Sequence, residues 1–125
     1  MKKKILLVVD DEASLLKTTL FRLNKSGYEA FGAVDGEKAL VLAREKMPDL
    51  ILLDVFLPGM HGDEVAKILK KDPILKVIPI VLISAVDETL EEKARESGAD
   101  GYLPKPFEAE ELLAMIEKHL TAPAK

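Results

Sequence analysis

Cysteine is absent from the 125 residues of this chain. A disulfide framework and a thiolate metal site are therefore excluded. No apolar run approaches the length that a membrane-spanning helix needs. The apolar stretch at 5–9 is also shorter than a usual signal-peptide core, and acidic residues follow it where a cleavage site would need small residues. The sequence thus indicates neither a disulfide scaffold nor a membrane protein.

An excess of positive charge is also missing. The sequence has 18 Lys and Arg residues against 22 Asp and Glu residues, which gives a formal net charge of −4. Because non-specific nucleic-acid binding uses a basic patch, this balance argues against direct binding of nucleic acid by this chain. The interspersed charges suit a soluble protein, and the lack of cysteine is compatible with the reducing cytoplasm, where we expect the protein to act.

The length and the apolar content fit a single domain. Hydrophobic residues make up 48% of the chain, which is enough for a sizeable core in a domain of ordinary size. We place this domain at residues 1–121 and interpret residues 122–125 as a tail or the start of a linker. Met1 and the lysine-rich start favour a true N-terminus. A stand-alone domain and a piece of a longer chain both remain open.

Five short apolar runs alternate with five amphipathic patterns of helical period. The runs lie at 5–9, 28–33, 50–55, 78–84 and 101–103. The helical patterns lie at 12–25, 36–46, 63–71, 88–97 and 108–120. Three of the runs are continuously apolar, which is typical of strands covered on both faces of a parallel sheet. The repeated strand–helix order predicts an α/β fold, (βα)5, with a doubly wound five-stranded parallel sheet.

The helical patterns differ in how much apolar surface they offer. The third is expected to bury Val65, Ile68 and Leu69. The fourth is mostly charged, and only Leu90 and Ala94 are expected to be buried. Because a helix that buries so little has low local stability, the fourth helix is the element that we expect to shift most easily.

Polar side chains stand at the ends of four predicted strands. Asp10 and Asp11 follow the first, Asp54 closes the third, Ser84 closes the fourth and Lys105 follows the fifth. Because the carboxyl ends of parallel strands meet at one edge, where α/β proteins bind ligands, we expect one shared site. Three gathered carboxylates repel one another, and Mg²⁺ relieves this conflict with its preference for oxygen ligands. The site therefore predicts phosphoryl transfer, in which a carboxylate can itself be the nucleophile.

Each of these residues also has an ordinary structural interpretation. The acidic pair Asp10–Asp11 can cap a helix, and Asp54 can begin a turn. Ser84 can be a cap, and Lys105 can be a solvated side chain. However, Lys105 lies between two prolines in "YLPKPF", which hold its backbone extended. We favour one shared site because the ordinary interpretation requires four coincidences at the same sheet edge.

The strand ends lie in the motifs "LLVVDDE", "DLILLDVFLPGMHG", "VLISA" and "DGYLPKPF". Together, in this order and over essentially the whole chain, these motifs resemble the response-regulator receiver domain of two-component signalling. The resemblance implies a flavodoxin-like fold with strand order 2-1-3-4-5. It also implies a phosphoacceptor signalling switch with autophosphorylation and slow autodephosphorylation, and no role as an enzyme in small-molecule turnover.

The resemblance implies a role for each residue of the predicted site. Asp54 would accept a phosphoryl group from the phosphohistidine of a histidine kinase or of a phosphotransfer protein. Mg²⁺ would be bound by Asp10, Asp11 and Asp54 and by the backbone carbonyl of Phe56. Lys105 would contact the phosphoryl oxygens and so help to neutralise their charge.

The resemblance also implies how the switch would reach a partner. Ser84 would move toward the phosphoryl group, and Tyr102 would swing inward behind it. The Lys105–Pro106 peptide bond would be cis. The surface formed by the fourth helix, the fifth strand and the fifth helix would then control a downstream protein or an output domain. Met115 stands where many DNA-binding members carry an arginine used in dimerisation, so we expect a monomer or a weak dimer.

Two other functions fit parts of the pattern. A phosphorylation-independent interaction module would need only the fold, and the intact set of acidic, hydroxyl and lysine residues argues against it. An aspartyl-phosphate phosphatase of the haloacid-dehalogenase type would carry a second Asp two residues after the nucleophile. This chain has Phe56 at that position, so we rank the phosphatase below the switch.

The phosphorylated form of Asp54 is predicted to be long-lived. By family position, the apolar residues Phe56 and Val86 flank the acceptor, and neither can position a water molecule for hydrolysis. After removal of the phosphodonor, the phosphorylated fraction, measured by intact mass, is therefore expected to persist well beyond seconds. Complete loss within seconds would contradict this prediction.

Overall fold

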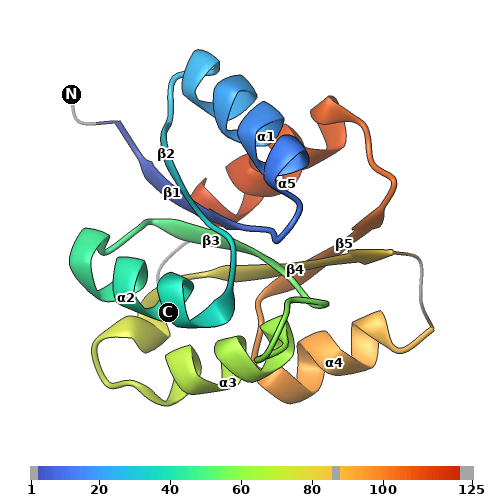
Figure 1. Cartoon of the computed structure of the whole chain (residues 1–125). Coiled ribbons are helices and arrows are strands. Elements are labelled where there is room, and N and C mark those ends of the chain that lie inside the picture. Colours follow the sequence, from blue (N-terminus) through green and yellow to red (C-terminus); the bar gives the residue numbers. More distant parts are fainter. Residues whose placement is uncertain (1–2, 86–87, 122–125) are drawn as a thin grey trace.

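The computed structural model describes residues 3–85 and 88–121, so Val86 and the tail expected at 122–125 lie outside the described residues. Within these ranges, five strands alternate with five α-helices (Figure 1). The strands are β1 (Ile5–Val9), β2 (Glu29–Ala33), β3 (Leu50–Asp54), β4 (Ile80–Ala85) and β5 (Gly101–Lys105). The α-helices are α1 (Ala13–Lys25), α2 (Gly36–Lys46), α3 (Gly62–Lys71), α4 (Leu90–Ser97) and α5 (Ala109–Thr121).

The strands form one parallel sheet in the order β2-β1-β3-β4-β5. This arrangement confirms the predicted doubly wound α/β fold and the strand order that the family resemblance implied. Helices α1 and α5 pack on one face of the sheet, and α2, α3 and α4 pack on the other (Figure 1). The order in which strands are added across the sheet reverses between the neighbouring parallel strands β1 and β3, and ligands bind beyond the carboxyl ends of the strands at such a switch point.

The central strands are buried on both faces. All four residues from Leu50 to Leu53 in β3 have no exposed surface. Side chains of alternate residues point to opposite faces of the sheet. Ile51 and Leu53 pack with α2, α3 and α4, whereas Leu50 and Leu52 pack with α1 and α5. Burying one such side chain stabilises the fold by about 1.5–3 kcal/mol. The continuous apolar run is thus explained by a strand that contributes to two cores at once.

The buried faces of α3 and α4 agree with their sequence patterns only in part. The expectation that α4 buries Leu90 and Ala94 is confirmed, since they are 3% and 4% exposed, but Ser97 is also buried in this helix. The expectation for Ile68 in α3 was wrong, because this side chain is 40% exposed. The buried face of α3 runs through Gly62, Val65, Ala66 and Leu69. Its neighbour Ile68 is rotated by about 100° from Leu69 on a helix of 3.6 residues per turn and therefore faces outward.

Both edges of the sheet are blocked against further strand pairing. At the β2 edge, the Asn24 side chain accepts a hydrogen bond from the Ala30 N–H (3.1 Å) and donates one to the Ala30 carbonyl (3.4 Å). At the β5 edge stands Pro104, which has no backbone N–H to offer. Exposed strand edges are templates for association, so both features disfavour it. This gives Pro104, the first proline of "YLPKPF", a structural role.

A short 3-10 helix, η1 (Leu75–Val77), precedes β4 and was not expected from the sequence. In the part of the chain that the structure describes, no helix combines the length and the apolar character needed to cross a membrane.

Gly62 allows α3 to start directly against the end of β3. Its N–H donates to the Val55 carbonyl at 2.7 Å, and a Cβ at this position would overlap the backbone carbonyl of Asp54. Backbone cannot move aside as a flexible side chain can, so Gly62→Ala is expected to destabilise the fold by about 1–3 kcal/mol. Urea unfolding measures this change in the free energy of unfolding.

The control for this prediction is Lys67→Ala on the exposed face of the same helix. This change is expected to alter stability by no more than about 0.5 kcal/mol. Equal stability of Gly62→Ala and wild type would show that α3 does not need this close approach.

Candidate functional site

The predicted site residues meet at the carboxyl edge of the sheet. Asp10 follows β1, Asp54 ends β3, and Lys105 ends β5. Carboxylate oxygens of Asp10, Asp11 and Asp54 lie within 4.8 Å of one another, and Asp11 is the exposed member of this acidic group. Residues that are far apart in the sequence thus form one charged cluster, as their positions at strand ends predicted.

Lys105 reaches across the sheet edge to the acidic group. Its Nζ lies 2.9 Å from Oδ2 of Asp54 and 3.6 Å from Oδ2 of Asp10. The side chains of Asp54 and Asp10 are only 10% and 12% exposed. Because water screens these charges poorly, their attraction to Lys105 is stronger than it would be at the surface.

Local backbone hydrogen bonds fix the two buried carboxylates. Oδ1 of Asp10 accepts from the Glu12 N–H (2.9 Å), and Oδ1 of Asp54 accepts from the Phe56 N–H (3.1 Å). Asp54 therefore does begin a turn, as its ordinary structural interpretation stated, whereas Asp10 shapes a turn ahead of α1, whose N-cap residue is Glu12. In each case Oδ2 is left to face Lys105, so the turn and the charged site use different oxygens of the same carboxylate.

Burial sets the protonation behaviour of the central pair. Burial raises the pKa of the Asp54 carboxyl above its ordinary value of 3.8, although the hydrogen bond and the charge of Lys105 act in the opposite direction. Burial alone would lower the pKa of Lys105, but the hydrogen bond to Asp54 and its charge outweigh burial and raise this pKa. The ionised form of Asp54 is thus less favourable in the fold than in water, while the ammonium of Lys105 is favoured.

The acidic group has the chemistry of a magnesium site. Three carboxylates converge and one ammonium partly balances them, so a further positive charge would relieve the remaining repulsion. Mg²⁺ prefers hard oxygen ligands and usually retains several waters, which suits a group whose member Asp11 is exposed. The residues present therefore fit this ion.

The remaining predicted residues, Ser84 and Tyr102, lie on β4 and β5. Ser84 is 2% exposed, and its hydroxyl oxygen has no hydrogen-bond partner among the described residues. Tyr102 is 37% exposed and pairs with Leu82 across the β4–β5 ladder. The Lys105–Pro106 bond is cis, which confirms the expectation from the family. The hydroxyl of Ser84 is buried without a partner among the described residues, whereas the ring of Tyr102 is exposed.

A small cavity lies beneath Asp54 and Lys105. Its lining includes the apolar side chains of Val8, Leu52 and Leu112, together with Leu15 of α1. These groups keep the inner side of the carboxylate away from bulk water. The apolar side chains that line the cavity thus contribute to the burial that raises the pKa of Asp54.

One charged neighbour of the site, Lys93, was not expected from the sequence. The Nζ of Lys93 in α4 lies 4.7 Å from the ring centroid of Phe56, and the His61 ring meets the same ring edge-on at 5.7 Å. His61 also forms a capping box with Glu64 at the start of α3. No spacing rule links Lys93 to Phe56, because they come from different elements and meet only through the packing of α4.

The fold and the site identify a class of protein. Residues 6–117 match the response regulator receiver domain, and the chain belongs to this family. It is 43% identical over 118 residues to the alkaline phosphatase synthesis transcriptional regulatory protein PhoP of Bacillus subtilis, covering 94% of this chain and 48% of that protein. It is 41% identical over 121 residues to the DNA-binding response regulator MtrA of Mycobacterium tuberculosis, covering 96% of this chain and 51% of that protein. The chain thus spans about half the length of these relatives.

Solved structures show the same fold. A putative response regulator from Chloroflexus aurantiacus superposes with a TM-score of 0.92 at 34% identity, covering 97% of this chain and 100% of that one. The chemotaxis response regulator CheY4 of Vibrio cholerae gives a TM-score of 0.88 at 32% identity, covering 95% of this chain and 100% of that one. The protein is therefore a receiver domain of two-component signalling, which is generally a signalling module.

Neutralising Asp54 is predicted to stabilise the metal-free fold. A carboxyl whose pKa is raised by folding stabilises the fold while it is protonated, below its unfolded pKa, and this contribution is lost as the pH rises through its folded pKa. Asp54→Asn mimics the neutral form at every pH. In the presence of EDTA, its free energy of unfolding is thus expected to exceed that of wild type at pH 7, with the difference vanishing below about pH 3.8.

Magnesium is expected to reverse this order. Mg²⁺ binds only the folded wild-type site tightly, so excess metal should raise the stability of wild type more than that of Asp54→Asn. Urea unfolding at several pH values, with EDTA or with Mg²⁺, measures both effects. A destabilised variant in EDTA at pH 7 would contradict the inferred environment of Asp54.

Proposed function

We propose that the chain is a phosphoacceptor switch in which Asp54 receives a phosphoryl group from a histidine kinase or a phosphotransfer protein. One observation carries this proposal: the buried carboxylate of Asp54 contacts Lys105 within a group that also contains Asp10 and Asp11. Such a site binds a divalent cation and neutralises phosphoryl oxygens, which are the two needs of phosphoryl transfer.

The proposed step is an in-line displacement. A carboxylate oxygen of Asp54 attacks the phosphorus of the donor's phosphohistidine, a P–O bond forms and the P–N bond breaks. The electron pair of the broken bond stays on the imidazole nitrogen of the donor. Mg²⁺, held by Asp10, Asp11, Asp54 and the backbone carbonyl of Phe56, would supply positive charge beside the transferred oxygens. Lys105, at the carboxyl end of β5, supplies a second positive charge.

The proposed switch follows from groups that gain partners after the transfer. The hydroxyl of Ser84 would donate to a phosphoryl oxygen, and Tyr102 would follow it inward. These contacts exist only in the modified state, so they bias an equilibrium between two conformations. The responding surface consists of α4, β5 and α5. Helix α4 buries only Leu90, Ala94 and Ser97, which gives it low local stability.

The proposed partners are proteins. The named relatives include a DNA-binding response regulator, and this chain spans about half of it. Residues 1–121 therefore act as a receiver that controls a downstream protein or an output domain, and they do not contact nucleic acid directly. The receiver acts in the cytoplasm as a monomer or a weak dimer. It has no small-molecule turnover beyond its own phosphorylation and slow dephosphorylation.

Phosphorylation by a small donor tests this function. Incubation with acetyl phosphate and Mg²⁺, followed by intact mass measurement, is expected to show one added phosphoryl group on wild type. Asp54→Asn is expected to show none, and EDTA is expected to suppress the adduct on wild type. Asp63→Asn is a matched control, because Asp63 lies in the first turn of α3 and is not part of the acidic group.

The outcomes separate the candidate functions. An unchanged adduct on Asp54→Asn would remove Asp54 as the acceptor. The absence of any adduct on wild type would favour the phosphorylation-independent interaction module.

A further inference from the structure

Phe56 connects the acceptor to α4. Its N–H donates to Oδ1 of Asp54, so its backbone is tied to the acceptor carboxylate itself. Its ring is 48% exposed and lies under the ammonium of Lys93, at 4.7 Å from the ring centroid. A cation at this distance from an aromatic face is attracted by the ring quadrupole. A continuous physical path thus runs from Asp54 through Phe56 to α4.

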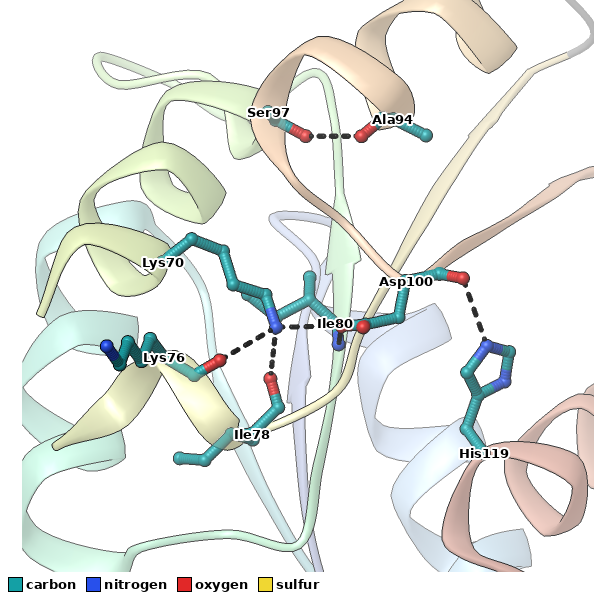
Figure 2. A network of polar contacts seen from close by, with 8 residues as sticks. All are labelled: Lys70, Lys76, Ile78, Ile80, Ala94, Ser97, Asp100 and His119. Carbon is teal, nitrogen blue, oxygen red and sulfur yellow. Dashed lines mark hydrogen bonds and ion pairs between the residues drawn. The ribbon is translucent and has the colours of Figure 1, made fainter. Parts of the chain in front are cut away.

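The far end of α4 is held much more firmly. Figure 2 shows the ammonium of Lys70 donating to the carbonyls of Lys76 (3.1 Å) and Ile78 (2.8 Å) and to Oδ2 of Asp100 (2.8 Å). The same oxygen of Asp100 accepts from the Ile80 N–H at 2.8 Å. This network ties the connection between α4 and β5 to α3 and β4.

Helix α5 adds a further tie at this connection. Nε2 of His119 lies 3.3 Å from the carbonyl oxygen of Asp100, and Gly101 leaves the space that the imidazole occupies (Figure 2). Residue Asp100 is therefore fixed from both faces of the sheet. A shift of α4 has to pivot about this end, so the first half of the helix, which carries Lys93, moves most.

We propose that the contact between Lys93 and Phe56 holds α4 in its unphosphorylated position and is weakened when Asp54 is phosphorylated. This inference deepens the proposed function and rests on it. The bond from Phe56 to Asp54 is made to an unmodified carboxylate in this structure. A phosphoryl group on Asp54 and a metal ion bound to the Phe56 carbonyl would both shift the backbone of Phe56. The ring of Phe56 would move with its backbone.

The contact therefore opposes the phosphorylated state. Removing it is expected to favour that state and to tighten the binding of a phosphoryl analogue. The attraction of a partly exposed cation to an aromatic ring corresponds to a change of about two- to five-fold in an equilibrium constant.

Beryllofluoride, added to the full chain with excess Mg²⁺, is the probe for this inference. Its dissociation constant is measured by calorimetry for wild type, Lys93→Gln, Phe56→Leu and the double variant. Lys93→Gln is expected to lower the dissociation constant by about two- to five-fold, and to have little further effect in the Phe56→Leu background. Lys93→Arg keeps a cation over the ring and is expected to resemble wild type.

A second measurement reports the position of α4. Without beryllofluoride, the backbone amide shifts of α4 in Lys93→Gln are expected to move toward those of the beryllofluoride-bound wild type. Arg95→Gln is the matched control, because it removes the same charge from an exposed position of the same helix. This control is expected to leave both the affinity and the shifts unchanged.

The results distinguish this inference from the function on which it rests. If wild type does not bind beryllofluoride, the phosphoacceptor function fails and the coupling fails with it. If wild type binds but Lys93→Gln binds equally or more weakly, the coupling is overturned and the phosphoacceptor function stands. If Lys93→Gln and Arg95→Gln have equal effects, the change in affinity comes from the net charge of α4 and not from the contact with Phe56. This result would also overturn the coupling.

Discussion

The convergence of three carboxylates at one sheet edge is the constraint on which the rest of this structure depends. Asp10, Asp11 and Asp54 come from two neighbouring strand ends, and like charges so close together oppose folding. The fold tolerates them because Lys105 crosses from β5 and lies 2.9 Å from Asp54. Burial still raises the pKa of Asp54. Additional positive charge at the site would therefore be favourable, and the burial of Asp54 costs stability.

The scaffold divides into a rigid part and a weakly held part. The central strand β3 is buried on both faces, and its last residue is Asp54, so the proposed acceptor lies on a fully buried element. Helix α4 buries few side chains but is tied at its end by Lys70 and Asp100. Local stability is therefore low beside the site and high at the opposite end of the helix. In the proposed switch, this gradient would let a change at Asp54 move one helix without disturbing the sheet.

Much of the fold was predictable because each local pattern agreed with the global arrangement. Continuous apolar runs indicated strands covered on both faces, and polar residues directly after them indicated the site. The errors have simple physical causes. Ile68 was assigned to a buried face because it is apolar, yet its angular position on α3 points it outward. The 3-10 helix η1 is too short to leave a periodic signal.

The sequence by itself determined which chemical groups stand at the strand ends, since that depends only on residue order and on the period of the apolar pattern. Only the tertiary structure decided how those groups pair. The contact of Lys105 with Asp54 and the position of the Lys93 ammonium over the Phe56 ring each join residues that are far apart in the sequence. Their distances follow from the packing of helices and strands, which no local pattern encodes.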